Sequence, residues 1–248
     1  MADTEKADGT RWRGLGETAA AALETRRYAL ASLSERLATS GVNAGDLRFR
    51  KELEEVWIPG VEILPRTVHP QRHRGYFAEL ARSSEGTLHE IGFWPNQWAA
   101  AVMFAGTAKG FHIHPPHIPE GEDPAAWIRR LFVEEPGRHD LRAYDKEQWD
   151  VMFILHGISE MFLIDERAGM PRRKMRFFIE GDQMPGPNNV AVVIPPGVAH
   201  ALRPASSADL IMVYGTSTVF NPDFEGRIRS SVEQSFPPED WQQWWESV

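Results

Sequence analysis

The sequence predicts an all-β protein, an antiparallel jelly roll with an N-terminal helical appendage and a short C-terminal helix. Five runs rich in β-branched and aromatic residues predict strands, and they lie at 151–155, 158–164, 174–179, 190–194 and 210–214. Glycine, proline and asparagine separate these runs, which is typical of turns between antiparallel strands. The region 57–81 predicts a further strand, turn and strand, punctuated by prolines and glycines.

Four segments are expected along the chain. Residues 1–15 predict a disordered arm, because they are mostly small or charged. Residues 16–56 hold a helical segment whose leucines offer one apolar face. The jelly-roll domain spans 57–235, and 236–248 is a helical tail with tryptophans at helical spacing. Within the domain, 115–150 is an insertion that serves as a lid, a substrate wall or a plain surface excursion.

Composition agrees with one soluble domain. The 248 residues are 42% hydrophobic, which is enough for a substantial core. No apolar run approaches the roughly 18 residues that span a bilayer, and the first residues lack a signal-peptide pattern, so a cytoplasmic location is expected. The chain has no cysteine, so any metal must take histidine and carboxylate ligands. The net charge of -8 argues against a general nucleic-acid binder.

Two short motifs predict a cluster of histidines. His112 and His114 flank one residue, so on a strand their imidazoles project from the same face. In the second motif, a buried strand at 190–194 is followed by a sharp turn at 195–197 and then by His200, which is sent back toward that face. The two motifs therefore predict that the three imidazoles converge.

Together these two motifs resemble the two-part signature of the cupin barrel. The resemblance extends further, because four segments occur in the order and spacing of dTDP-4-dehydrorhamnose 3,5-epimerases. These segments are 73–79, 109–112, 194–200 and 220–229. They span most of the β-rich body, and the chain is identified as a divergent relative of this family.

The resemblance implies an isomerase or epimerase that moves a proton next to a carbonyl of a polar substrate, such as a nucleotide sugar. It makes His112 the base and Tyr214 the partner acid, and it implies a homodimer and no required cofactor. Thr218 stands where the family has the aspartate that pairs with the base. The residues implied to bind substrate are Arg74, Phe77, Glu79, Lys109, His200 and Thr218. Arg74 and Glu79 also suit a plain cross-strand ion pair.

A metal-dependent cupin enzyme is the second hypothesis, because His114 stands where the epimerases usually have glutamine. His112, His114, His200 and Glu120 form a set suited to one divalent Fe, Mn, Ni or Zn ion, with His117 as a substitute for the glutamate. Such an enzyme would be a dioxygenase, a lyase or a metal-assisted isomerase. A third hypothesis is a non-catalytic binding module for small molecules. Each hypothesis has a small-molecule ligand and excludes nucleic-acid and membrane partners.

Overall fold

The structure, a computed structural model, describes residues 42–43, 57–114, 121, 139–140, 148–167, 170–221 and 226–228. The predicted arm at 1–15, almost all of the helical segment at 16–56 and the tail at 236–248 lie outside the described residues. The same holds for most of the insertion at 115–150. These parts of the domain organisation stay predictions.

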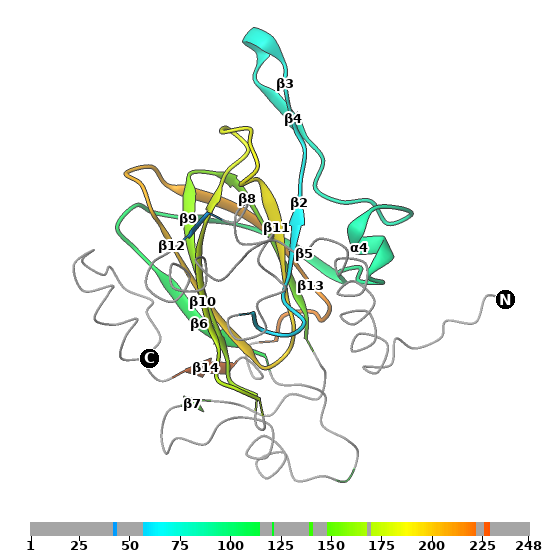
Figure 1. Ribbon diagram of the computed structural model, residues 1–248, viewed down its shortest axis with the longest axis vertical. Coiled ribbons are helices and arrows are strands. Elements are labelled where there is room, and N and C mark those ends of the chain that lie inside the picture. The colour runs from blue at the N-terminus through cyan, green and yellow to red at the C-terminus, as the bar shows by residue number, and fades with distance from the viewer. Residues whose placement is uncertain are drawn as a thin grey trace, which may run out of the picture.

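Two β-sheets face each other and form the body of the protein (Figure 1). All strand pairs in them are antiparallel except β1 with β10. Sheet A is, in spatial order, β1 (Val42–Asn43), β10 (Lys174–Glu180), β9 (Ile158–Asp165), β12 (Val198–Pro204), β6 (Lys109–Ile113), β14 (Gly226–Ile228) and β7 (His139–Asp140). Sheet B is β2 (Glu62–Pro65), β11 (Val190–Ile194), β8 (Asp150–His156), β13 (Leu210–Thr216) and β5 (Gln97–Met103). The all-β jelly roll predicted from the sequence is confirmed.

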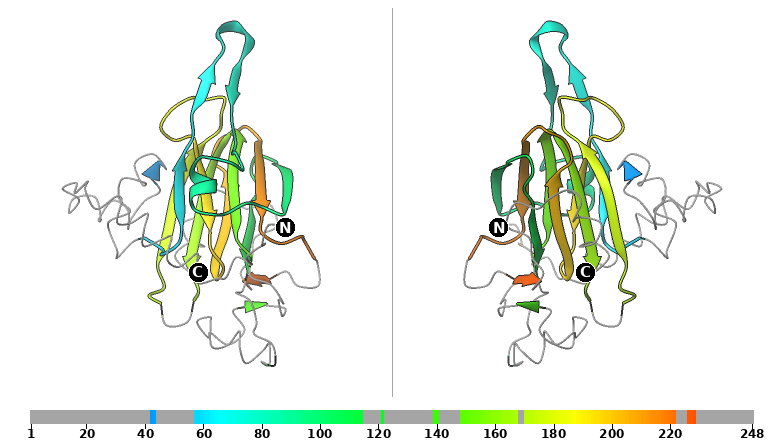
Figure 2. Two further views of the ribbon diagram at one scale, coloured as in Figure 1. Left: turned by 90° about the vertical axis from the view of Figure 1, so that its right-hand side faces the viewer. Right: turned by 90° about the vertical axis from the view of Figure 1, so that its left-hand side faces the viewer.

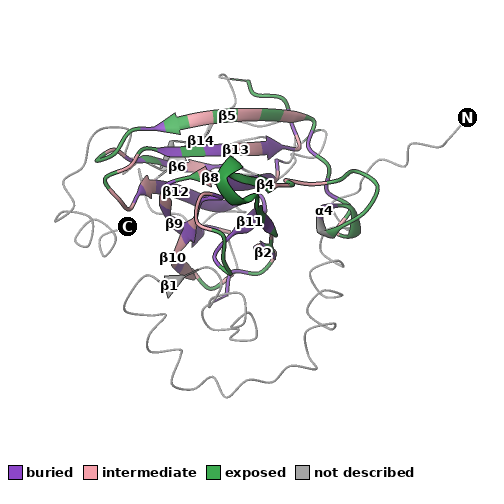
Figure 3. Ribbon diagram, turned by 90° about the horizontal axis from the view of Figure 1, so that it is seen from above, coloured by how far each residue is buried: buried purple, intermediate pink, exposed green. Residues whose placement is uncertain are grey.

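The core lies between the two sheets, as the burial colouring shows (Figure 3). Residues alternate along β8, where Met152 and Ile154 face the core while Val151 and Phe153 join an outer cluster. The same alternation runs along β11. Side chains two apart therefore share a face, and this rule places the polar residues of the site below.

Both surfaces of sheet B are covered where its central strands pass. The outer cluster packs residues of β8 and β11 against Leu88 of α4 (Thr87–Glu90) and against Phe93. This double coverage explains why β8 and β11 are apolar almost throughout instead of alternating with polar residues.

A hairpin projects from one end of the barrel. It is formed by β3 (Val68–Pro70) and β4 (Tyr76–Ala78), joined through the short helix η1 (Arg72–Arg74). Figure 1 and Figure 2 place β14 and β7 at the opposite end of the barrel. The strand, turn and strand predicted over 57–81 are confirmed.

An ion pair ties the base of the hairpin to the barrel. Arg66 donates to both carboxylate oxygens of Asp182, at 2.8 and 3.0 Å, and each side chain is only 4% exposed. Removing one partner of such a pair leaves a buried charge without compensation.

Asp182→Asn should therefore lower the free energy of unfolding by about 3 kcal/mol, measured by urea denaturation. The control is Glu85→Gln, which breaks an ion pair with Arg82 in which both side chains are more than half exposed. The control should keep the wild-type midpoint, because solvent screens that pair. Equal midpoints for the two variants would contradict the importance of burial here.

The five strands predicted from the sequence are all present, whereas the sequence does not predict β5. Three consecutive alanines interrupt its pattern, and alanine is depleted in strands. Among the described residues, no helix has the length and apolar character needed to cross a membrane.

Candidate active site

The two predicted histidine motifs meet on the inner face of sheet A. His200 lies between Val198 and Leu202 on β12, and both of these flanking side chains belong to the core between the sheets. His112 on β6 is the direct cross-strand partner of His200. Directly opposed residues of an antiparallel pair share a face, so His112 also points inward, and His114 follows two residues on.

The three imidazoles form one compact group. Each offers a ring nitrogen that lies within 4.8 Å of those of the other two. The ring centroids of His112 and His200 are 5.7 Å apart, and those of His114 and His200 are 5.4 Å apart. His114 and His200 are buried, whereas His112 is half-buried. His112 is thus the histidine that solvent, or a substrate, can reach.

A carboxylate from the opposite sheet completes the cluster. Asp150 begins β8 and shares the inward face of Met152 and Ile154. Its Oδ2 lies 3.2 Å from Nε2 of His114 and 3.4 Å from Nε2 of His200. Burial by itself would raise the pKa of the Asp150 carboxyl, but His114, His200 and a hydrogen bond from Gln148 lower it to about 2. Asp150 is therefore ionised throughout the physiological range.

A chain of buried hydrogen bonds holds this carboxylate in place. Gln148 donates from Nε2 to Oδ1 of Asp150 at 3.0 Å, and the same nitrogen lies 3.2 Å from Nε2 of His114. The hydroxyl of Thr218 donates to Oε1 of Gln148. Thr216 donates in turn to the backbone carbonyl of Thr218, at 2.5 Å. The network joins β8 to the end of β13.

Thr218 is linked to the Asp150 carboxylate through Gln148, to which its hydroxyl donates. Tyr214 lies on the inner face of sheet B, where it packs against the core and pairs across the strands with Met152. It is one step along that face from Thr216, which pairs with Asp150. Tyr214 and the histidines thus come from facing sheets. Lys109 opens β6 on the same strand as His112 and is exposed.

Three predicted substrate-binding residues lie away from the histidine cluster in the structure. Arg74, Phe77 and Glu79 belong to the projecting hairpin or its base, whereas His112 pairs with β14 at the other end of the barrel (Figure 2). The ion pair considered for Arg74 and Glu79 is not the one observed, because Glu79 pairs with Arg82 at 2.7 Å. This chain does not bring the three residues to its own histidines.

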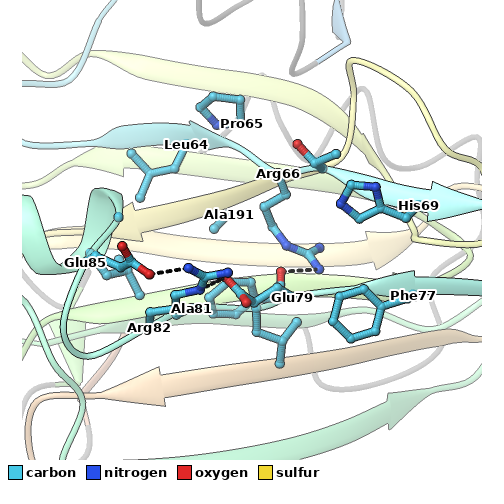
Figure 4. A pocket seen from close by; sticks show the side chains of 15 residues that line it. Leu64, Pro65, Arg66, His69, Phe77, Glu79, Ala81, Arg82, Glu85 and Ala191 are labelled. Atoms are coloured by element: carbon cyan, nitrogen blue, oxygen red, sulfur yellow. Dashed lines mark hydrogen bonds and ion pairs between the residues drawn. The ribbon is translucent and has the colours of Figure 1, made fainter.

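A cavity of about 410 Å³ lies at the base of the hairpin (Figure 4). Phe77 and Glu79 line it, together with Arg66, whose guanidinium donates to the backbone carbonyl of Glu79 at 3.5 Å. None of the clustered histidines is among its lining residues. The cavity is therefore separate from the histidine site.

Glu120 and His117, the carboxylate and the substitute proposed for a metal, lie outside the described residues. Sequence reasoning missed Asp150 and Gln148. A signal for Asp150 was present, because a charged residue opens a strand that is otherwise apolar. Its partners lie in the other sheet, so spacing along the chain did not reveal the contact.

Comparison with known proteins gives one curated sequence relative and several solved structures. No family model matches the chain. The spore coat polysaccharide biosynthesis protein SpsL of Bacillus subtilis (strain 168) is 26% identical over 167 residues, which cover 67% of this chain and 84% of SpsL.

Two sugar epimerases are among the solved structures that this chain is similar to. NovW, a 4-keto-6-deoxy sugar epimerase of Streptomyces spheroides, is 18% identical with a TM-score of 0.47, covering 68% of this chain and 69% of its own. ChmJ, a 3'-monoepimerase of Streptomyces bikiniensis, is 20% identical with a TM-score of 0.48, covering 75% and 74%.

Proposed function

We propose that the protein is an isomerase that epimerises a sugar next to a carbonyl group, on a nucleotide-linked substrate. The observation that carries this proposal is the placement of His112, a half-buried imidazole, on one sheet and of Tyr214 on the facing sheet. The sequence relationship to SpsL, a polysaccharide biosynthesis protein, supports a sugar substrate.

In the proposed reaction, neutral His112 removes the proton on the carbon next to the carbonyl. The electron pair of the broken C–H bond forms an enolate, and the Tyr214 hydroxyl returns a proton to the other face of that carbon. The two groups regain their starting protonation by exchange with solvent. The configuration inverts, and no oxidant or reductant is consumed.

The base is supported differently from that of the resembled epimerases. Thr218 stands where those epimerases have an aspartate, and its hydroxyl donates to Gln148. The carboxylate that lies near the histidines in this chain is that of Asp150, which accepts from Gln148. The contacts of Asp150 are to His114 and His200.

The hairpin residues fit this function through a second copy of the chain. Arg74 and Phe77 are exposed on a hairpin that projects away from the barrel, and Phe77 is 53% exposed. An exposed aromatic ring beside a cation suits a nucleotide base and its phosphates. We propose a homodimer in which these residues, with Glu79, line the partner's site.

The function is tested by proton exchange. The protein is incubated in D₂O with dTDP- and UDP-linked 4-keto-6-deoxyhexoses, and deuterium next to the ketone is followed by NMR. Exchange and inversion are expected for at least one of these substrates. Tyr214→Phe should slow inversion by at least about 100-fold while exchange on the original face continues, because only the returning acid is lost.

Ser206→Ala is the control, since Ser206 lies in the loop between β12 and β13 and its hydroxyl accepts from the Ala208 amide. It should leave inversion unchanged. If no substrate exchanges above the buffer rate but one of them raises the melting temperature, the proposal is wrong and a binding module is indicated.

A further inference from the structure

We propose that Asp150, His114 and His200 bind one divalent transition metal through Oδ2, Nε2 and Nε2, and that His112 remains outside the metal's ligand set. This assigns the carboxylate ligand to Asp150 on sheet B instead of to Glu120 in the insertion. The inference goes beyond the proposed reaction and holds whatever the substrate is.

The distances between the donor atoms fit one ion. Two donors that are each about 2.1 Å from a metal lie about 3.2 to 3.4 Å apart when the bond angle is roughly 100–110°. Oδ2 of Asp150 is 3.2 Å from Nε2 of His114 and 3.4 Å from Nε2 of His200. One carboxylate oxygen is thus at ligand spacing from two imidazole nitrogens.

The hydrogen bond of His200 assigns its tautomer. Nδ1 of His200 lies 3.4 Å from the backbone carbonyl of Val198, which can only accept, so Nδ1 carries the proton. Nε2 is then the ring nitrogen of His200 that faces the Asp150 carboxylate, at 3.4 Å from its Oδ2. Metal-bound histidines commonly donate their other ring nitrogen to a backbone carbonyl in this way.

The environment of His114 leads to the same result. Thr218 donates to Oε1 of Gln148, which fixes the orientation of that amide. The amide nitrogen of Gln148 therefore lies 3.2 Å from Nε2 of His114, and Oδ2 of Asp150 lies 3.2 Å from the same ring nitrogen. Two ring nitrogens and one anionic oxygen therefore converge, and a cation among them would contact all three.

The three proposed ligands are buried, and a hydrogen bond orients the carboxylate among them. Asp150, His114 and His200 are 3%, 6% and 3% exposed, while His112 is more accessible. Gln148 holds the second carboxylate oxygen of Asp150, as partners of metal-bound carboxylates usually do. Two histidines and one carboxylate would leave coordination positions open, and a metal bound there would supply Lewis-acid stabilisation to an oxygen of a bound substrate.

The test measures metal binding without any substrate. Chelator-stripped protein is titrated with Co(II) and with Zn(II), followed by calorimetry and by the visible absorption of Co(II). We expect one equivalent of metal per chain. Asp150→Asn and His114→Gln should each weaken binding by at least about 100-fold, because a ligand is lost.

The controls separate the ligands from their neighbours. Asp209→Asn changes an exposed aspartate that accepts from the Ala105 amide, and it should bind metal like the wild type. Glu120→Gln and His112→Gln should do the same. Thr218→Val should weaken binding by about tenfold by freeing Gln148, which tests the site even if Asp150→Asn folds poorly.

Three results would overturn the assignment. They are less than one equivalent bound to the wild type, wild-type affinity in Asp150→Asn, and loss of metal in Glu120→Gln or His112→Gln. Because no turnover is measured, a failed metal titration leaves the proton-exchange experiment unaffected, and a failed exchange experiment leaves the titration unaffected.

Discussion

Replacing His112 with glutamine should lower the rate of proton exchange next to the substrate carbonyl by about two to four orders of magnitude. Glutamine keeps a polar side chain of similar length but has no nitrogen that accepts a proton near neutral pH. His112 is half-buried, so the change should leave the unfolding midpoint close to that of the wild type. The result expected is an inactive, folded protein.

The measurement compares deuterium incorporation in wild type, His112→Gln and a control. His156→Gln serves as the control, because His156 is exposed at the end of β8 remote from Asp150, which begins that strand. It should exchange protons at the wild-type rate. If His112→Gln exchanges protons at the wild-type rate and His200→Gln does not exchange them, His200 and not His112 would be the base.

A rate loss at His112 can be separated from loss of metal. If His112 is the base and the metal has other ligands, His112→Gln loses exchange and keeps one equivalent of metal. Asp150→Asn should lose the metal, and its exchange rate then reports how far the reaction depends on that ion. The two variants therefore assign base and metal ligand independently.

The histidine cluster could be predicted from the sequence because local rules place all three residues. Period two puts His112 and His114 on one face, and the turn at 195–197 returns His200 to it. Asp150 could not be placed in this way, because its contacts cross from one sheet to the other. Strand patterning gives the face of a residue, but it does not give the opposing residue in a facing sheet.

The hairpin illustrates a second limit of sequence reasoning. The sequence contains the motif at 73–79 and predicts its strand and turn, as the structure confirms. The sequence does not predict where the hairpin lies relative to the histidines, because a motif carries no information on which end of a barrel it joins. Arg74 and Phe77 belong to the same series of sequence motifs as His112. The hairpin that carries them, however, lies at the opposite end of the barrel from β14, the strand that pairs with His112.

Strands β6 and β12 approach each other closely at Gly110, which leaves no room for a side chain there. A side chain at Gly110 would place Cβ 2.6 Å from Cα of Ala201 and 2.8 Å from the backbone oxygen of His200. Both atoms belong to the backbone of a paired central strand, so they cannot move aside as a flexible side chain would. Gly110 also has a φ of 124°, a conformation that L side chains rarely adopt.

Gly110→Ala should therefore lower the free energy of unfolding by about 3 kcal/mol or more, measured by urea denaturation. Gly106→Ala is the matched control, because Gly106 also has a positive φ, 78°, but nothing lies within 4 Å of its added Cβ. It should cost only about 1 kcal/mol, from backbone strain alone. Equal losses in the two variants would contradict the close approach.

The same substitution should also disable the site, because β6 must move away from β12 to make room for the methyl group. Since His112 is the cross-strand partner of His200, that movement separates His112 and His114 from His200. Folded Gly110→Ala, prepared at low temperature, should bind metal at least about 100-fold more weakly than Gly106→Ala. Its proton exchange should fall with it, because the base on β6 is displaced. Wild-type metal affinity in this variant would show that the two strands do not need to meet at Gly110.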